Sequence, residues 1–263
     1  MKKLLVLGMV LIVGIAIGYA THFMTGQTPI IYGQKWHVHD LNRPQPKIVT
    51  PAPANRHTAP PSDAIVLFNG SDLDEFKNKD LEVKDGAMIM GIGNQQTIDS
   101  FGDVQLHVEW ASPYPSDNEG QNKGNSGIIF MGLYEVQVLN SYQSQTYPDG
   151  QAGAIYGVHP PMVNAMRPSN EWQSYDIFFR APRFNLDGSV DSPAHVTVIH
   201  NGVLVQFNQI YNGPSEWRKN GVYKPHAEKL PLKIQWHNSP VRYRNIWIRP
   251  LDEYNQLDED SKQ

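Results

Sequence analysis

The sequence contains no cysteine in its 263 residues. This absence excludes disulfide bonds, thiolate metal sites, a cysteine nucleophile and a lipid-modified N-terminal cysteine. It does not exclude an exported protein, because a domain of this size can build its core without covalent cross-links. An excess of one charge is also missing, since 22 basic and 26 acidic residues give a net charge of −4. Without a Lys/Arg-rich run, the sequence argues against nucleic-acid binding.

Motifs that mark several common enzyme classes are absent as well. The stretch GNSG at 124–127 is followed by Ile128 where a G-x-S-x-G nucleophile motif requires glycine. No H-E-x-x-H, phosphate-binding loop or dinucleotide-binding fingerprint occurs. The sequence therefore disfavours proteases, nucleotide-dependent enzymes and oxidoreductases of the Rossmann type.

The longest uncharged apolar run extends from Leu4 to Ala20, directly after Lys2 and Lys3. A basic start followed by such a run is typical of an export signal, and we interpret residues 1–20 as a signal peptide or membrane anchor. Gly18 and Ala20 have suitable spacing for cleavage, whereas the run is also just long enough to span a bilayer. Both outcomes stay open, and either places the rest of the chain outside the cytoplasm.

Three further segments follow from composition. Residues 21–62 contain six prolines between Pro44 and Pro61, which predicts a semi-extended linker. The HVHD stretch at 37–40 in this linker is interpreted as an incidental pair of histidines. Residues 63–251 form the predicted domain, and the acidic tail at 252–263 is expected to be solvated.

The predicted domain consists of short apolar runs separated by turns, and no window longer than ten residues has a helical period. Dipeptides typical of two-residue hairpins occur at 85–86, 187–188 and 201–202. This texture predicts an all-β jelly-roll sandwich of two antiparallel sheets. The expected strands cover 64–68, 87–90, 104–110, 127–131, 134–140, 174–180, 195–200, 203–207, 232–236 and 245–249.

Two of these strands combine an apolar face with a polar one. In YEVQVLN (134–140), alternation separates Tyr134, Val136 and Val138 from Glu135 and Gln137. In VQLHVEW (104–110), the residues on the polar face are Gln105, His107 and Glu109. If both strands belonged to one concave sheet, these polar groups would converge with His200 and His237.

Aromatic and amide side chains suited to carbohydrate lie near these strands. Aromatic rings stack on the apolar faces of a pyranose, and planar amides hydrogen-bond its hydroxyls. The candidates of this kind are Tyr142, Tyr147, Tyr156, Asn164 and Trp172.

Four long stretches resemble the 3-keto-disaccharide hydrolase family. They are GNSGIIFMGLYEVQVLNSY, TYPDGQAGAIYGVHPPMVNAMRPSNEWQSYDIFFRAPRF, HVTVIHNGVLVQ and PVRYRNIWIRPL. The resemblance extends from about Ala64 to Leu251 and implies a concanavalin A-like fold. It also implies an exported protein that acts on glycosides whose 3-hydroxyl has been oxidised to a ketone.

A 3-keto sugar changes the catalytic groups that cleavage requires. An ordinary glycosidase needs two carboxyl groups on either side of the bond, but Gln137 and Asn140 are amides and the sequence does not place Glu109 beside Glu135. The ketone acidifies the hydrogen on C2, so one general base, one proton donor and a group that stabilises the enolate suffice. Elimination of the C1 substituent followed by addition of water then gives net hydrolysis.

We therefore expect Glu135, His200 and His237 to supply the base and the proton donor. Arg242 or Arg244 is the expected stabiliser of the enolate. A divalent cation bound by Glu135 and a histidine is an alternative stabiliser. The expected substrate-binding residues are Asn125, Gln137, Asn140, Tyr156, Asn164, Trp172 and Arg242.

The chain departs from the family pattern at two places. Asn140 stands where many members have aspartate, and Trp236-His237-Asn238 stands where they have Asp-His-Gly. If those positions serve catalysis in relatives, this chain binds sugar without cleaving it. A non-catalytic carbohydrate-binding or surface-display module is therefore the alternative to an enzyme, and a structural role in a cell-envelope complex is a third.

Overall fold

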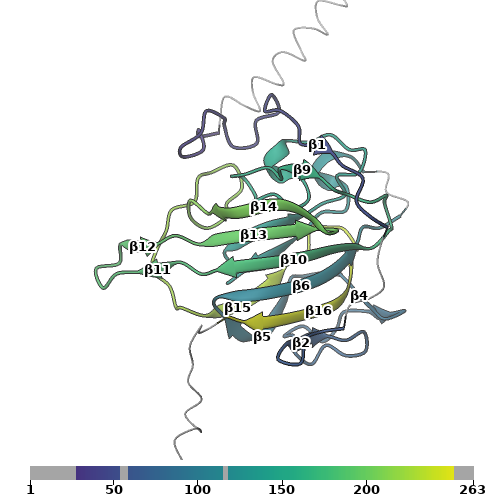
Figure 1. Cartoon of the computed structure of the whole chain (residues 1–263). Helices are drawn as coiled ribbons and strands as arrows, with labels where there is room; N and C mark the ends of the chain where they lie inside the picture. The colour runs from purple at the N-terminus through teal and green to yellow at the C-terminus, as the bar shows by residue number, and fades with distance from the viewer. Residues whose placement is uncertain (1–27, 54–58, 115–117, 252–263) are drawn as a thin grey trace, which may run out of the picture.

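A computed structural model describes residues 28–53, 59–114 and 118–251 of the chain (Figure 1). The apolar segment at 1–20 and the acidic tail at 252–263 lie outside these residues. Within the described part of the chain, no helix is long and apolar enough to cross a membrane. The helical elements described there are two single 3-10 turns, Gly120–Asn122 and Pro148–Gly150.

Two antiparallel sheets form the body of the domain (Figure 1). The larger has the order β14-β13-β10-β6-β16-β4-β3, and β2 also pairs with β16. Its strands are β2 (Ile65–Phe68), β3 (Val83–Lys84), β4 (Ala87–Ile89), β6 (Val104–Ala111), β10 (Gln173–Arg180), β13 (His195–His200), β14 (Val203–Ile210) and β16 (Arg242–Pro250). The smaller has the order β5-β15-β7-β8, with β5 (Gln95–Phe101), β7 (Ser126–Phe130), β8 (Tyr134–Val138) and β15 (Leu230–Ile234).

Two short strand pairs complete the fold. The parallel pair consists of β1 (Lys47–Ile48) and β9 (Val163–Asn164), and the antiparallel pair of β11 (Arg183–Phe184) and β12 (Val190–Ser192). Figure 1 shows β1 and β9 above the larger sheet and the β11–β12 ribbon projecting to the left. The prediction of an all-β jelly-roll sandwich is confirmed, and each of the ten expected strands is present.

Turn chemistry explains two of the three expected hairpins. Asp85-Gly86 joins β3 to β4 and Asn201-Gly202 joins β13 to β14, and all four residues have positive φ, as a two-residue turn of type I′ requires. The third prediction is wrong, because Asp187-Gly188 lies within a five-residue loop. That loop is closed by a hydrogen bond of 2.8 Å from the backbone N–H of Asn185 to the carbonyl of Ser189.

The core lies between the two sheets and joins them through apolar and polar contacts. The rings of Phe130 (β7) and Phe179 (β10) stack with centroids 4.6 Å apart. The Tyr175 hydroxyl donates to the carbonyl of Gln137 at 2.8 Å, and the Tyr243 hydroxyl donates to Ser126 Oγ at 2.7 Å. Buried tyrosines of this kind fill core volume while satisfying their polar ends.

The two polar strand faces do not converge. Alternation on β6 and β8 is as expected, with Leu106 and Val136 in the core. However, β6 belongs to the larger sheet and β8 to the smaller one. Because each sheet turns its apolar face toward the shared core, the polar faces point in opposite directions. Glu109 and Glu135 therefore do not share one concave sheet, and the condition under which their polar groups would converge is not met.

Residues 28–53 pack against the domain instead of forming the expected spacer. Ile31 and Val38 are fully buried, and β1 pairs with β9. His39 and Asp40, within the HVHD stretch, are also buried. A proline-rich composition disfavours regular helices and central strands, but it does not prevent apolar side chains from anchoring an irregular segment. We refer to residues 28–53 as the N-terminal arm.

Candidate active site

A cavity of about 350 Å³ lies on the face of the smaller sheet that points away from the core. This volume falls within the range of small-molecule sites, roughly 300–1,000 Å³. Its polar lining consists of Asn125, Glu135, Gln137, Tyr156, Ser215, Lys233, Gln235 and His237. Its remaining walls are formed by Ile129, Gly132, Leu133 and Trp217.

Glu135 is the carboxylate of this cavity. It lies on β8 opposite Ile129, and its side chain is 6% exposed. Burial raises its pKa to about 8, although the nearby Lys233 ammonium opposes this rise. Its backbone N–H donates to Ser215 Oγ at 3.0 Å, which ties the strand to a loop on the cavity wall. A carboxyl group with a pKa near neutrality is suited to accept and return a proton.

Two amide side chains present hydrogen-bond acceptors beside Glu135. The Asn125 Nδ2 group donates to the carbonyl of Gln121 at 2.7 Å, and Gln137 Nε2 donates to Gln121 Oε1 at 3.4 Å. Each of these bonds uses one of the two N–H groups of its amide. Asn125 Oδ1 and Gln137 Oε1 are buried and have no hydrogen-bond partner among the described residues. Buried acceptors of this kind are normally satisfied, so a ligand hydroxyl in the cavity would suit both.

Two aromatic residues of the lining add a hydrogen-bond donor and a ring on which a sugar can stack. The hydroxyl groups of Tyr156 and Tyr147 lie 3.3 Å apart, and burial raises the pKa of both phenols, so each remains protonated at neutral pH. Tyr156 is therefore a neutral hydrogen-bond donor at the cavity wall. Trp217 is 69% exposed while lining the cavity, a position from which its ring can stack on a sugar.

The structure brings together five of the residues that the sequence singled out, namely Asn125, Glu135, Gln137, Tyr156 and His237. His200 does not join them. It is fully buried in the core, with its ring 4.8 Å from Tyr175 and 6.1 Å from Trp110. Burial, helped by the charge of Arg167, lowers its pKa to about 3. In β13, every second residue is buried, and His200 falls on this buried face together with Val196 and Val198. The alternation of the sequence could therefore have indicated that His200 is buried.

Four expected substrate-binding residues also lie outside the cavity lining. Asn140 donates to Ser169 Oγ at 2.7 Å, and Asn164 donates to the carbonyl of Ser141 at 2.9 Å. Trp172 packs against the guanidinium of Arg244, 4.0 Å from the ring centroid, and that of Arg242, 5.3 Å away. Arg242 donates to Asn170 Oδ1 at 2.6 Å. Neither arginine lines the cavity, so the structure does not bring Arg242 or Arg244 to the place where the enolate would form.

Glu109 belongs to a charge network on the outer face of the larger sheet. Its carboxylate accepts hydrogen bonds from Arg244 at 2.6 Å and Asn245 at 2.9 Å, and it lies 3.7 Å from the His107 ring. Burial alone would raise the pKa of Glu109, but hydrogen bonds from His107, Asn245 and Arg244 outweigh it and lower the pKa to about 2. A carboxylate held ionised in this way is a structural ion-pair partner.

Four polar or aromatic residues of the lining were not predicted from the sequence, namely Ser215, Trp217, Lys233 and Gln235. Lys233 and Gln235 follow the polar phase of the strand around 232–236, so alternation was a usable signal. Ser215 and Trp217 lie on the loop after β14, which reaches the cavity only through tertiary packing. The departure at Trp236 does not obstruct the site, because its indole packs against the core.

A divalent cation at Glu135 and a histidine was one expectation. Glu135 and His237 both line the cavity, but among the described residues no three His, Cys, Asp or Glu side chains gather where they could hold a metal ion. Two donors of this kind form an incomplete set for a tightly bound cation. We therefore derive no catalytic step through a metal.

Comparison with known proteins places these observations in a family context. Residues 63–249 match the model of a 3-keto-alpha-glucoside-1,2-lyase-like domain. The fold is similar to that of a proposed glycosyl hydrolase from Parabacteroides distasonis ATCC 8503, with 39% identity and a TM-score of 0.73 over 84% of this chain and 100% of the other. A second such protein from the same organism has 20% identity and a TM-score of 0.52, covering 72% and 94% of the two chains, and supports the fold alone. No curated protein matched the chain.

Proposed function

Because the chain belongs to the family of 3-keto-alpha-glucoside-1,2-lyase-like domains, we propose that it is a glycoside-cleaving enzyme specific for substrates oxidised at C3. The proposal extends the family description to elimination followed by hydration, which is net hydrolysis. The substrate class is a 3-keto-glycoside or 3-keto-disaccharide.

One observation carries this proposal: Glu135 is the single carboxylate among the described residues that line the cavity. Hydrolysis by a conventional glycosidase needs a pair of carboxyl groups, about 5–5.5 Å apart for retention or 6.5–9.5 Å apart for inversion. Glu109, the other candidate carboxylate, lies on the larger sheet and forms an ion pair with Arg244. Elimination from a 3-keto sugar needs one base, which this cavity provides.

The proposed reaction starts with Glu135 as the general base. Its ionised carboxylate removes the proton from C2, and the electron pair of that C–H bond forms the enolate across C2 and C3. When the C3 ketone re-forms, the pair moves into a C1–C2 double bond and the bond from C1 to the leaving oxygen breaks. The leaving oxygen takes a proton from His237. Water then loses a proton to His237 as its oxygen bonds to C1, and Glu135 returns its proton to C2, which gives the free 3-keto sugar and restores both residues.

Two donors in the lining suit the enolate. Lys233 places a cation within electrostatic range of Glu135, and Tyr156 offers a protonated phenol. Preorganised donors of this kind stabilise negative charge that develops in the transition state, at roughly 3–4 kcal/mol for each one removed in known enzymes. Asn125 and Gln137, which line the cavity and have amide oxygens without a partner among the described residues, would bind sugar hydroxyls and set the orientation of C2.

The test compares a 3-keto-glucoside with its parent glucoside on the full chain, with products followed by mass spectrometry. We expect cleavage of the keto compound alone, and a primary isotope effect when C2 carries deuterium. Glu135→Gln should lower kcat by at least about 10³-fold, because the base is lost, while calorimetry still detects binding of the keto compound. A parallel sample with a chelator reports on any divalent cation.

Other results would point elsewhere. Cleavage of the parent glucoside without a C2 isotope effect would indicate a conventional glycosidase. Binding without cleavage would indicate the alternative reading, a carbohydrate-binding module, and Glu135→Gln would then leave the affinity unchanged.

We also propose that the chain acts outside the cytoplasm, in the periplasm or cell envelope. The support is the basic and apolar N-terminus at 1–20. Fractionation of cells that express the full chain would test this, and N-terminal sequencing of the product would distinguish cleavage from anchoring.

A further inference from the structure

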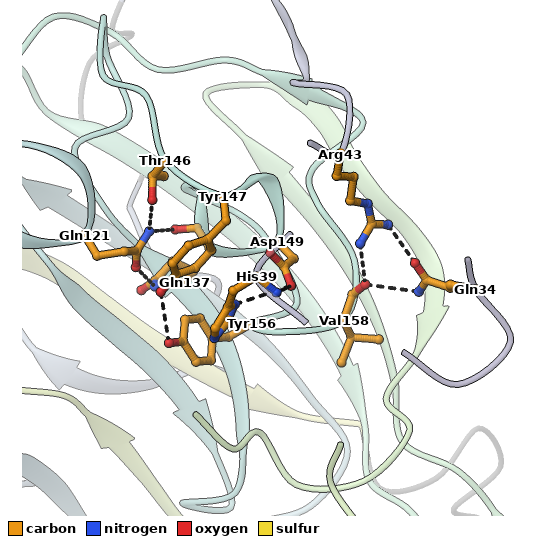
Figure 2. A network of polar contacts seen from close by, with 11 residues as sticks. Gln34, His39, Arg43, Gln121, Gln137, Thr146, Tyr147, Asp149, Tyr156 and Val158 are labelled. Atoms are coloured by element: carbon orange, nitrogen blue, oxygen red, sulfur yellow. Dashed lines mark hydrogen bonds and ion pairs between the residues drawn. The ribbon is translucent and has the colours of Figure 1, made fainter. Parts of the chain in front are cut away.

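The N-terminal arm is fastened to the domain close to the candidate active site, although it precedes the residues that match the family model. Arg43 donates to the carbonyl of Val158 at 3.2 Å and to Gln34 Oε1 at 2.8 Å, and Gln34 Nε2 donates to the same carbonyl at 3.1 Å (Figure 2). Val158 lies two residues after Tyr156. These contacts hold the arm beside the segment that carries the cavity tyrosine.

His39 is an arm residue whose ring contacts two tyrosines of this region. Its side chain is 6% exposed, and its φ of 62° lies in the left-handed region, which a non-glycine residue rarely adopts. The backbone N–H of His39 donates to Asp149 Oδ2 at 2.9 Å, and His39 Nδ1 lies 3.4 Å from the same oxygen. Asp149 is fully buried. A strained backbone persists only where the surroundings fix it, and such residues cluster at functional sites.

The ring of His39 is connected to the cavity by contacts with Tyr147 and Tyr156 (Figure 2). It stacks on Tyr147 with ring centroids 4.0 Å apart, and its distance to the Tyr156 ring is 5.0 Å. The Tyr147 hydroxyl lies 3.3 Å from the Tyr156 hydroxyl. Tyr156 lines the cavity together with Glu135. A continuous set of contacts therefore connects Asp149, His39, Tyr147 and Tyr156.

The polarity of this pair is not explained by packing. Neither ring nitrogen of His39 has a hydrogen-bond partner among the described residues, and Asp149 Oδ1 has none either. Leaving buried polar atoms without hydrogen bonds costs stability. Asp149 accepts the backbone N–H of His39, so stacking on Tyr147 is the contact through which the His39 ring can act on the site.

We propose that His39 is a positioning residue of the active site, supplied by the N-terminal arm. The backbone N–H of His39 is bonded to Asp149, which keeps the His39 ring stacked on Tyr147. Tyr147 in turn fixes the Tyr156 hydroxyl at the cavity wall. This inference rests on the proposed function, in which Tyr156 stabilises the enolate. The family domain at 63–249 would then be incomplete as a catalyst without the arm.

Two substitutions at position 39 separate positioning from a purely structural role. His39→Asn removes the stacked ring but keeps a residue type that tolerates positive φ and can hydrogen-bond Asp149. His39→Phe keeps the ring and removes its polar atoms. Tyr147→Phe removes only the hydroxyl that meets Tyr156. As a matched control, Val38→Ala removes buried apolar surface from the arm at the neighbouring position and leaves the side chains of His39 and Tyr147 unchanged.

The experiment measures kcat and KM for a 3-keto-glucoside, its Kd by calorimetry, and the thermal midpoint, all on the full chain. We expect His39→Asn and Tyr147→Phe to lower kcat about 10- to 100-fold with KM changed less than about 3-fold. His39→Phe should recover kcat to within about 3-fold of wild type. Val38→Ala should lower the midpoint and leave kcat unchanged. Wild-type kcat in both His39→Asn and Tyr147→Phe would overturn the inference.

The binding measurement separates failure of the inference from failure of the proposed function. If the wild type binds the keto sugar without cleaving it, the proposed reaction is wrong. The inference then predicts that His39→Asn and Tyr147→Phe weaken binding at least about 5-fold through Tyr156 while Val38→Ala does not, and equal affinities would overturn it. A wild type that neither binds nor cleaves the sugar would overturn both proposals.

Discussion

The carboxylate of Glu135 occupies the space into which a side chain on Gly127 would project. The two residues lie on adjacent strands, β8 and β7, with Gly127 opposite Gln137 and Glu135 opposite Ile129. A Cβ atom at Gly127 would collide with the carboxylate and with Glu135 Cγ. Gly127 does not have a positive φ, so this glycine is explained by close approach and not by backbone conformation.

Gly127→Ala should therefore displace the carboxylate without strain in the backbone. We expect kcat/KM for the 3-keto-glucoside to fall at least about 10-fold, since small misplacements of a reacting group have large effects. Steady-state kinetics on the folded variant would measure this. Gly91→Ala is the matched control, because its Cβ would meet only a methyl group of Leu81 at 3.3 Å. Unchanged kinetics in Gly127→Ala would show that the position of the Glu135 carboxylate does not limit turnover.

The raised pKa of Glu135, about 8, predicts the pH dependence of the reaction. A general base must be ionised and the proton donor must still hold its proton, so kcat/KM of the wild type should rise about tenfold per pH unit on the acidic side of its maximum and fall again at higher pH, where the proton donor is lost. A pH–rate profile on the 3-keto-glucoside would measure the inflection. An inflection near pH 4.5, the usual range for glutamate, would argue against Glu135 as the base.

The same pKa shift predicts a stability effect that does not depend on catalysis. The folded pKa lies above the unfolded value of about 4.5, so the folded state binds an extra proton between pH 4.5 and 8. Stability therefore declines as the pH rises through this window. Glu135→Gln removes the penalty and should stabilise the protein by up to about 5 kcal/mol at pH 9, at roughly 1.4 kcal/mol per pKa unit, and by little at pH 4.5. Denaturant unfolding at both values would measure the difference, and equal effects at the two pH values would contradict it.

His107 on the other sheet should respond to pH in a different window. Burial would lower its pKa, but hydrogen bonds and charges of Asp176 and Glu109 outweigh burial and raise it to about 9. Its stabilisation is therefore fully present below about pH 6.5 and is lost as the pH rises through 9. His107 Nδ1 lies 2.6 Å from Asp176 Oδ1.

Asp176→Asn should therefore cost about 1.5–3 kcal/mol of unfolding free energy at pH 6, as expected for a charge-assisted hydrogen bond. At pH 10 the same substitution should cost much less. Urea unfolding at the two values would measure this. Turnover of the 3-keto-glucoside should be unaffected, because this network faces away from the cavity. A large loss of turnover in a stable variant would reopen the question of a role for Glu109 and His107.

Local patterns in the sequence were sufficient to predict the strands and the face of β8 that lines the cavity. Alternation placed Val136 in the core and Glu135 on the opposite face, because the side-chain period of a strand is fixed by its backbone. The same rule did not reveal which sheet a strand joins. The pairing of β6 with β10 and β16 joins residues far apart in the chain. The hairpin of β7 and β8 joins its sheet through β15, which is also distant in sequence. This is why the sequence alone could not decide whether Glu109 lies beside Glu135.

The N-terminal arm was missed for a related reason. Its prolines predict an irregular backbone, which the structure has over most of its length. Irregular backbone does not imply solvent exposure, however, and the burial of Val38 and His39 depends on the loop that contains Asp149 and Tyr147. No periodicity within residues 37–40 could signal that contact. Resemblance to a family helped little here, because the matching residues begin at position 63.

Trp217 offers a final prediction about substrate binding. Its ring is 69% exposed at the cavity wall, which suits stacking on the sugar or on the leaving group of a 3-keto-disaccharide. Loss of such a contact costs roughly 0.5–1.5 kcal/mol beyond area burial, so Trp217→Ala should raise KM about 3- to 10-fold with little change in kcat. Trp217→Phe should restore most of the affinity.

Trp172→Ala is the matched control for this measurement. Trp172 was the tryptophan that the sequence favoured for sugar binding, but its ring packs against Arg244 at 4.0 Å and does not line the cavity. We expect its substitution to leave KM unchanged and to affect only stability. If Trp172→Ala raised KM and Trp217→Ala did not, the substrate would extend over the edge of the larger sheet, and the cavity around Glu135 would not be its main binding site.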